Sequence, residues 1–232
     1  MFLYLDPVYF ILVGPALLLS VYAQVRVKRT FGRYTRAATA RGLSGAQVAA
    51  YILRTHGIGD VAVERVRGFL SDHYDPRQRR LRLSPQVHDG RSIAAIGVAA
   101  HEAGHALQHA RGYLPLQVRS ALVPVTQIGS WLAWPLLFIG LLFSALSLVK
   151  LGILFFAGAV LFQLVTLPVE FDASRRAVAI LGGQGLLTAP ELDGTRQVLR
   201  AAALTYVAAA AAAVLQLLYF LLRAGLLGGG DE

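Results

Sequence analysis

The residues best suited to chemistry are His101 and His105, with Glu102 directly after the first histidine. On an α-helix, residues i and i+4 lie about 40° apart around the axis and about 6 Å apart along it. Two imidazoles at this spacing can therefore converge on one metal ion. Glu102 would lie beside them, where its carboxylate could take a proton from a metal-bound water that attacks a carbonyl. The pattern predicts a zinc site with Glu102 as the general base of peptide hydrolysis.

The surroundings of the motif favour a metal over a simple buried polar cluster. Residues 93–100 are apolar all round, which indicates a helix buried in protein or in lipid. Three ionisable groups in such a helix are costly without a partner or a metal. The chain contains no cysteine, so a transition metal must be held by histidines and carboxylates. We expect one Zn²⁺ per chain.

A third protein ligand is needed, and Glu170 is the better candidate. It follows a long apolar run and is expected on the same membrane side as the histidines. Asp172 is the rival, and because residues i and i+2 point about 200° apart on a helix, only one of the two can face the metal. Asp172 could instead pair with Arg175 or Arg176.

Two further residues compete for the ligand position. His109 continues the four-residue spacing, but it would lie about 12 Å along the helix from His101, too far to share one ion. We expect it to be a supporting or surface residue. Asp193 lies in a Leu-Asp-Gly string that matches the ligand motif of intramembrane site-2 proteases. Its surroundings are polar, which favours a cap or turn. Several side chains could stabilise an oxyanion: His73, Tyr74, His88, Tyr113, Arg175 and Tyr206.

The elements that must position this site are dominated by apolar runs. The chain is 56% hydrophobic, and uncharged stretches occupy about residues 7–25, 121–149, 151–169 and 202–222. Runs of about 18 or more apolar residues are typical of membrane spans. We therefore expect about four transmembrane helices in a lipid bilayer, with the first as a retained anchor and the middle two as a helical hairpin around Lys150.

Basic residues set the expected orientation. The net charge is +9, and residues 26–120 and 170–201 carry 16 and 4 of the 22 lysines and arginines. Because basic loops stay on the cytoplasmic side, both segments are expected in the cytoplasm of a multi-pass cell-membrane protein. The charges follow the spans rather than one recognition element, so no nucleic-acid partner is expected. No feature of the sequence specifies an oligomeric state.

The polar segment should contain helices and a small sheet. Ser44 and Ser92 are expected to cap helices that run to about Thr55 and Ala110. Alternating residues 61–66 and 80–84 predict a two-stranded ribbon, with a turn-rich stretch at 72–76 between them. A free edge beside residues 80–84 could bind an extended peptide by strand addition.

The predicted fold is therefore mainly α, a multi-pass membrane protein with a small cytoplasmic α+β zincin-like catalytic segment. The expected divisions are an N-terminal anchor, the catalytic segment, a transmembrane hairpin, a third-ligand helix with its linker, and a C-terminal span with its tail. Their boundaries are 1–25, 26–120, 121–169, 170–201 and 202–232.

Longer strings point to a family. Residues 99–108, 72–76 with 81–84, 167–174 and 198–207 resemble the bacterial membrane-bound neutral zinc metallopeptidases, the YugP-like proteins, over nearly the whole chain. The chain is also similar, more distantly, to HtpX and the CAAX prenyl proteases, which combine HExxH with a later E-x-x-x-D helix.

The resemblance implies a gluzincin-like zinc metalloendopeptidase with a peptide or membrane-protein substrate. Carried over by residue, it makes His101, His105 and Glu170 the ligands and Glu102 the base. Ser174 stands where the relatives have an aspartate that usually supports a ligand histidine, which keeps Asp172 in play.

Two other functions compete with this interpretation. A site-2-type intramembrane protease would use Asp193 as the third ligand, with the helix from Ile93 as a span. A catalytically inactive zinc-binding membrane adaptor would keep the metal structurally, and the intact Glu102 argues against it because a structural site needs no base.

Overall fold

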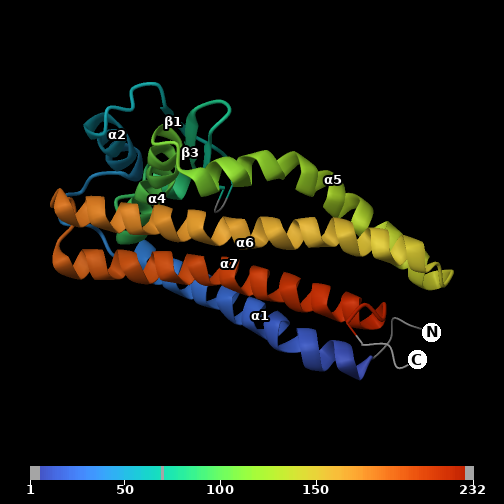
Figure 1. Ribbon diagram of the computed structural model, residues 1–232. Helices are drawn as coiled ribbons and strands as arrows, with labels where there is room; N and C mark the ends of the chain where they lie inside the picture. The colour runs from blue at the N-terminus through green and yellow to red at the C-terminus, as the bar shows by residue number, and fades with distance from the viewer. Residues whose placement is uncertain (1–5, 69–70, 228–232) are drawn as a thin grey trace. The chain divides into compact units, whose positions relative to one another are not determined.

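The computed structural model describes residues 6–68 and 71–227, which are mainly helical (Figure 1). The helices are α1 Pro7–Thr35, α2 Gly45–Thr55, α3 Pro85–His88, α4 Ile93–Ala110, α5 Leu114–Leu142, α6 Leu146–Gly183 and α7 Ala189–Arg223. The strands are β1 Ala62–Arg65, β2 His73–Asp75 and β3 Arg80–Leu83.

Four of these helices, α1, α5, α6 and α7, are long and apolar enough to cross a membrane, as the four apolar runs predicted. The helices continue beyond those runs. The expected hairpin turn at Lys150 is wrong: α5 ends at Leu142 and α6 begins at Leu146, and Ser144 adopts a positive φ of 53° between them.

Glu170 was expected at the start of a separate polar helix, and this is also wrong. The third apolar run and the polar residues after it form one helix, α6, with Pro168 inside it. A proline removes one backbone hydrogen bond, a loss that long apolar helices tolerate where neighbouring groups replace it. Glu170 therefore lies in a helix interior, where its backbone is fixed.

The chain divides into two compact units, and four helices, α1, α5, α6 and α7, contribute residues to both. The spanning unit comprises the described parts of Met1–Ala23, Val118–Leu167 and Thr205–Glu232. Its buried cluster contains Leu137, Val149, Ile153 and Phe220. An added Cβ on Gly152 would lie 3.0 Å from the Leu137 nitrogen, so a glycine permits α5 and α6 to pack closely there.

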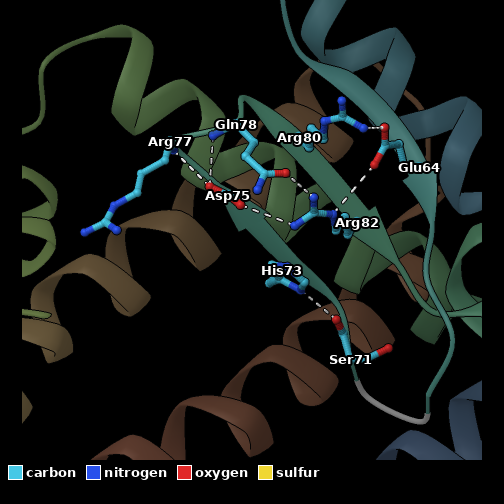
Figure 2. Close-up of polar contacts among 8 residues, drawn as sticks. All are labelled: Glu64, Ser71, His73, Asp75, Arg77, Gln78, Arg80 and Arg82. Carbon is cyan, nitrogen blue, oxygen red and sulfur yellow. Dashed lines mark hydrogen bonds and ion pairs between the residues drawn. The ribbon is translucent and has the colours of Figure 1, made fainter. Parts of the chain in front are cut away.

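The sheet unit comprises Gln24–Gln117 and Pro168–Leu204. Its sheet has three strands in the order β1-β3-β2, with β1 parallel and β2 antiparallel to β3, so the predicted two-stranded ribbon lacked a strand. Residues 73–75 form that strand because the turn comes later: Asp75 Oδ1 accepts from the Arg77 and Gln78 backbone nitrogens (Figure 2). Asp72 accepts from the Ser84 nitrogen at 2.7 Å and so ties the two strands together.

The central position of β3 excludes the strand addition expected beside residues 80–84, because β1 and β2 already occupy both of its edges. Leu81 and Leu83 of β3 point into the core and are fully buried. Arg80 and Arg82 lie on the opposite face, where Arg82 pairs with Glu64 and Asp75 (Figure 2). The alternation is that of a strand with one buried and one solvated face.

Helices α2 and α4 pack against each other and complete the core of the sheet unit. Ser44 forms a capping box with Gln47, and the Ser92 hydroxyl accepts from the Ala95 nitrogen, so both predicted caps are confirmed. A single bridge between Ala38 and Ser92 holds the start of α4. The helix that carries the two histidines is thus fixed at its first turn.

Candidate metal centre

Helices α4 and α6 bring together three side chains that could hold a metal. The His101 Nε2 and His105 Nε2 atoms lie 3.2 and 3.6 Å from Glu170 Oε2. The candidate ligand atoms of the three residues all lie within 4.8 Å of one another. The histidine pair follows from the four-residue spacing on one helix, and the carboxylate comes from a helix more than sixty residues later in the chain.

A glycine allows the two helices to approach. A Cβ added to Gly104 would lie 2.7 Å from the Ala173 carbonyl oxygen and 3.2 Å from the Ala173 Cα. Neither backbone atom could move away without shifting α6. Ala173 follows Glu170 by three residues, so it is nearly in line with it on one face of α6. The close contact at Gly104 therefore sets how far the Glu170 carboxylate reaches toward the histidines.

The ring orientations of both histidines are set by contacts at Nδ1. His101 Nδ1 lies 3.1 Å from Ser174 Oγ, and His105 Nδ1 lies 3.0 Å from Gln108 Oε1. Both rings therefore turn Nε2 toward Glu170. Ser174 occupies the position where the resemblance led us to expect an aspartate, and its hydroxyl contacts the same kind of atom that such an aspartate would support.

Asp172 does not join the three residues. Its Oδ2 accepts from Gln108 Nε2 at 2.9 Å, and its carboxylate pairs with both Arg175 and Arg176. Pairing with an arginine was one of the two roles that the sequence left open for this residue. Asp172 therefore belongs to the network behind His105 and faces away from the candidate ligand atoms.

The site is buried and strongly polar. Glu170 is 3% exposed, and His105 and Glu102 are also buried. Burial alone would lower the pKa of His105, but its contact with Glu170 and the negative charges of Glu102 and Glu170 outweigh that effect, so the pKa lies above its ordinary value. A cation is therefore favoured here, and a bound metal would replace the proton.

The donor set fits zinc. Two imidazole nitrogens and one carboxylate oxygen are the three protein ligands found in many catalytic zinc sites, which keep a fourth position for water or substrate. Both Nδ1 atoms contact other side chains, so each ring has Nε2 to offer. Glu102, next to His101 on α4, contributes a negative charge at His105. The contacts at Nδ1 give both histidine rings an orientation suited to binding.

The other candidate ligands lie elsewhere in the sheet unit. His109 Nδ1 lies 2.7 Å from the Tyr74 hydroxyl, beside a cavity of about 300 Å³ that both residues line. Burial and the charge of Asp75 raise the pKa of Tyr74 to about 12, so its hydroxyl keeps its proton beside His109. Asp193 is exposed and accepts from Gln197 Nε2 at 2.9 Å.

The candidate oxyanion stabilisers have other contacts. His73 Nδ1 lies 2.8 Å from the Ser71 carbonyl oxygen (Figure 2), and His88 Nδ1 lies 2.6 Å from Asp89. Arg176 stacks over the Tyr113 ring, and Arg175 is held by Asp172. Tyr206 belongs to the spanning unit. None of these contacts identifies one of these residues as the oxyanion stabiliser.

Gln108 is the site residue that the sequence reasoning missed. It is fully buried and contacts His105 as well as two groups on α6. Its position three residues after His105, on the same face of a buried apolar helix, was the available signal. A polar side chain in such a place needs hydrogen-bond partners, and its partners come from a distant segment.

Comparison with known proteins decides the family. The sequence profile of the family described as "putative neutral zinc metallopeptidase" matches residues 9–225. The chain belongs to this family. It is 49% identical over 218 residues to the "putative membrane protease YugP" of Bacillus subtilis (strain 168), which covers 94% of this chain and 96% of that protein.

The resemblance to YugP-like metallopeptidases is thereby confirmed, whereas the distant similarity to HtpX and the CAAX prenyl proteases stays a prediction. No solved structure matches the chain. The four apolar helices agree with a membrane location for this member of the metallopeptidase family.

Proposed function

We propose that this protein is a membrane-embedded zinc metalloendopeptidase of gluzincin type. In this proposal His101, His105 and Glu170 hold one Zn²⁺ per chain, and Glu102 is the general base. The observation that supports it best is the convergence within 4.8 Å of one ligand atom each from His101, His105 and Glu170. The two histidines lie on α4, which also carries Glu102, and Glu170 lies on α6. Membership of a metallopeptidase family supports the same reaction.

The chain's own residues supply the proton transfers. When bound, zinc lowers the pKa of a coordinated water and polarises a substrate carbonyl. Glu102 would accept the water proton and later deliver it to the leaving amine. Ser174 and Gln108 would hold the two imidazoles so that Nε2 stays directed at the ion. Burial of the site strengthens each of these electrostatic contacts.

The substrate is proposed to be a peptide segment or a membrane protein that reaches the site from the cytoplasm. The support for this orientation is the concentration of lysines and arginines in residues 26–120 and 170–201, which include all the site residues. The site-2 alternative has less support, because Asp193 is exposed and paired with Gln197 rather than grouped with the histidines.

The test is proteolysis of a fluorogenic peptide library by the full chain in detergent or proteoliposomes, with zinc content measured in parallel. Glu102→Gln should keep zinc and lower kcat/KM by about 10²–10⁴-fold, because it removes the base. Glu64→Gln, an exchange at a sheet glutamate, is the matched control and should keep full activity.

Proteolysis retained in Glu102→Gln, in preparations free of contaminating protease, would contradict the mechanism. A wild-type chain that binds zinc but cleaves none of the library, reconstituted membrane-protein substrates included, would favour the inactive adaptor.

A further inference from the structure

Gln108 makes more hydrogen bonds than a side chain that only fills space in the core would need. Its side chain is 0% exposed, and its carboxamide makes three hydrogen bonds. Oε1 lies 3.0 Å from His105 Nδ1, and Nε2 donates to the Val169 carbonyl at 2.8 Å and to Asp172 Oδ2 at 2.9 Å. A buried amide has little other means of satisfying these groups, so its orientation is well determined.

The amide orientation determines which nitrogen of His105 carries a proton. The Val169 carbonyl and the Asp172 carboxylate can only accept, so the Gln108 NH₂ group must face them. The Gln108 oxygen must then face His105 Nδ1, and because this oxygen can only accept, Nδ1 must carry the hydrogen. In the neutral ring, Nε2 is left as a lone pair directed at Glu170. This is the tautomer that a metal at Nε2 requires.

The same amide also holds the segment that carries the third candidate ligand. Val169 immediately precedes Glu170, and Asp172 follows it by two residues on α6. Two hydrogen bonds from one side chain of α4 therefore end on the helical turn around Glu170. Asp172 is held in place by Arg175 and Arg176, so it is not an uncompensated buried charge.

The contact at His101 is different in kind. The Ser174 hydroxyl that faces His101 Nδ1 can either donate or accept, so it orients the ring without selecting a tautomer. Ser174 also lies on α6, and among the described residues its hydroxyl makes one hydrogen bond to α4. The two histidines thus differ: His101 has one adaptable neighbour, and His105 has a neighbour fixed by two other bonds.

We propose that Gln108 is a positioning residue for zinc binding, which fixes the tautomer of His105 and holds Glu170 in register with it. The inference rests on the proposed metal centre and deepens it. Outer contacts of this kind are worth about 10–100-fold in metal affinity. Gln108 should therefore act on affinity and coordination geometry through His105 and Glu170, without touching the ion.

The experiment measures zinc affinity of the full chain in detergent by competition with a chelating dye, and the visible absorption of the Co²⁺-loaded form. Gln108→Met keeps most of the side-chain volume and removes all three hydrogen bonds. It should weaken the zinc Kd by about 10–100-fold and alter the Co²⁺ spectrum.

Thr195→Val is the matched control. Thr195 is equally buried, lies against Gly97 of α4, and its hydroxyl has no hydrogen-bond partner among the described residues. This variant should leave both the zinc Kd and the Co²⁺ spectrum unchanged. A folded Gln108→Met with a zinc Kd within twofold of wild type and an unchanged spectrum would overturn the proposal.

A pair of exchanges that together conserve the net charge keeps the proposal testable if Gln108→Met does not fold. Gln108→Glu alone keeps an acceptor for His105 but places an oxygen against Asp172, and it should weaken the zinc Kd by more than about tenfold. Adding Asp172→Asn restores a donor opposite that oxygen, whereas the Val169 carbonyl still faces it, so the double variant should recover part of the affinity.

A double variant that binds zinc no better than Gln108→Glu would overturn the positioning role. The failure of the metal centre itself is a separate result: wild type and Thr195→Val would then both lack zinc.

Discussion

Ile11 and Trp131 of the spanning unit leave 77% and 75% of their surfaces exposed, whereas Leu81 and Leu83 of the sheet unit are 0% exposed. Both units are rich in apolar residues, but the apolar side chains of the two units face different surroundings. Apolar side chains that point outward from long helices suit a hydrocarbon solvent. Those that alternate inward on β3 suit a protein core next to water.

The two units also place polar side chains differently. The sheet unit buries His105, Gln108, Glu170 and Asp172 in one connected cluster, and the charge of the buried Glu102 acts on His105. The spanning unit has a smaller cluster at its helix ends, in which Tyr219 donates to Asp6 and Tyr9 donates to Gln216. The spanning unit therefore suits a hydrocarbon environment and the sheet unit suits a rigid polar site, and four measurements test this difference.

The largest expected effect comes from metal removal. Chelation should abolish peptide cleavage and weaken the contacts between α4 and α6, because the ligands then lose their shared ion. Hydrogen exchange should accelerate by at least about tenfold in residues 93–110 and 168–183 and stay unchanged in 121–142 and 205–222. Equal acceleration in both sets would show that the two units are not energetically separate.

The second-largest expected difference between the two units is the loss of stability when an apolar side chain is truncated. Leu81→Ala should cost about 2–5 kcal/mol in the free energy of unfolding, because it leaves a cavity in a protein core. Ile11→Ala should change it by less than about 0.5 kcal/mol, because Ile11 is exposed. Thermal unfolding in detergent provides the measurement, and similar costs at both positions would contradict the assignment of Ile11 to a lipid-facing surface.

Glycine substitutions test the helix contact at the site. Gly104→Ala should destabilise the fold by about 1–3 kcal/mol and weaken zinc binding, since its Cβ would meet the Ala173 backbone at 2.7 Å. Gly158→Ala, also inside a helix, has no atom within 4 Å of an added Cβ and should be neutral or stabilising by up to about 1 kcal/mol. Zinc titration and thermal unfolding of both variants measure the difference, and zinc binding by Gly104→Ala equal to wild type would contradict this role of the glycine.

Two hydrogen-bonded tyrosines should give the smallest effects. Tyr74→Phe removes the bond to His109 and should cost about 1 kcal/mol in unfolding free energy. Tyr9→Phe removes the bond to Gln216 and should cost about 0.6 kcal/mol, a typical value for such bonds within membranes. Chemical denaturation of both variants compares them, and a larger loss in Tyr9→Phe would reverse the expected order.

Local sequence signals predicted much of this molecule. The histidine spacing placed both imidazoles on one face of α4, and the Ser44 and Ser92 caps marked where α2 and α4 begin. Length and apolar content were enough to find the four long helices. These features depend on residues within a few turns of one another, which is why one sequence reveals them.

Long-range features were harder to predict. β2 was interpreted as a turn because Asp72 and Asp75 are turn formers, yet Asp72 binds Ser84 across the sheet. The pairing of β2 with β3 also makes β3 a central strand. Gln108 has two partners more than sixty residues away, so no local pattern reveals those two contacts. Glu170 was selected over Asp172 by its place in the chain and by family resemblance, and only the packing at Gly104 supplies a geometric reason.

The central claim is tested most directly by the zinc content of purified wild type, His105→Ala, Glu170→Ala and Asp193→Ala, determined by mass spectrometry. We expect about one zinc per chain in wild type and in Asp193→Ala, and loss of zinc in His105→Ala and Glu170→Ala. Zinc retained in Glu170→Ala but lost in Asp193→Ala would contradict it.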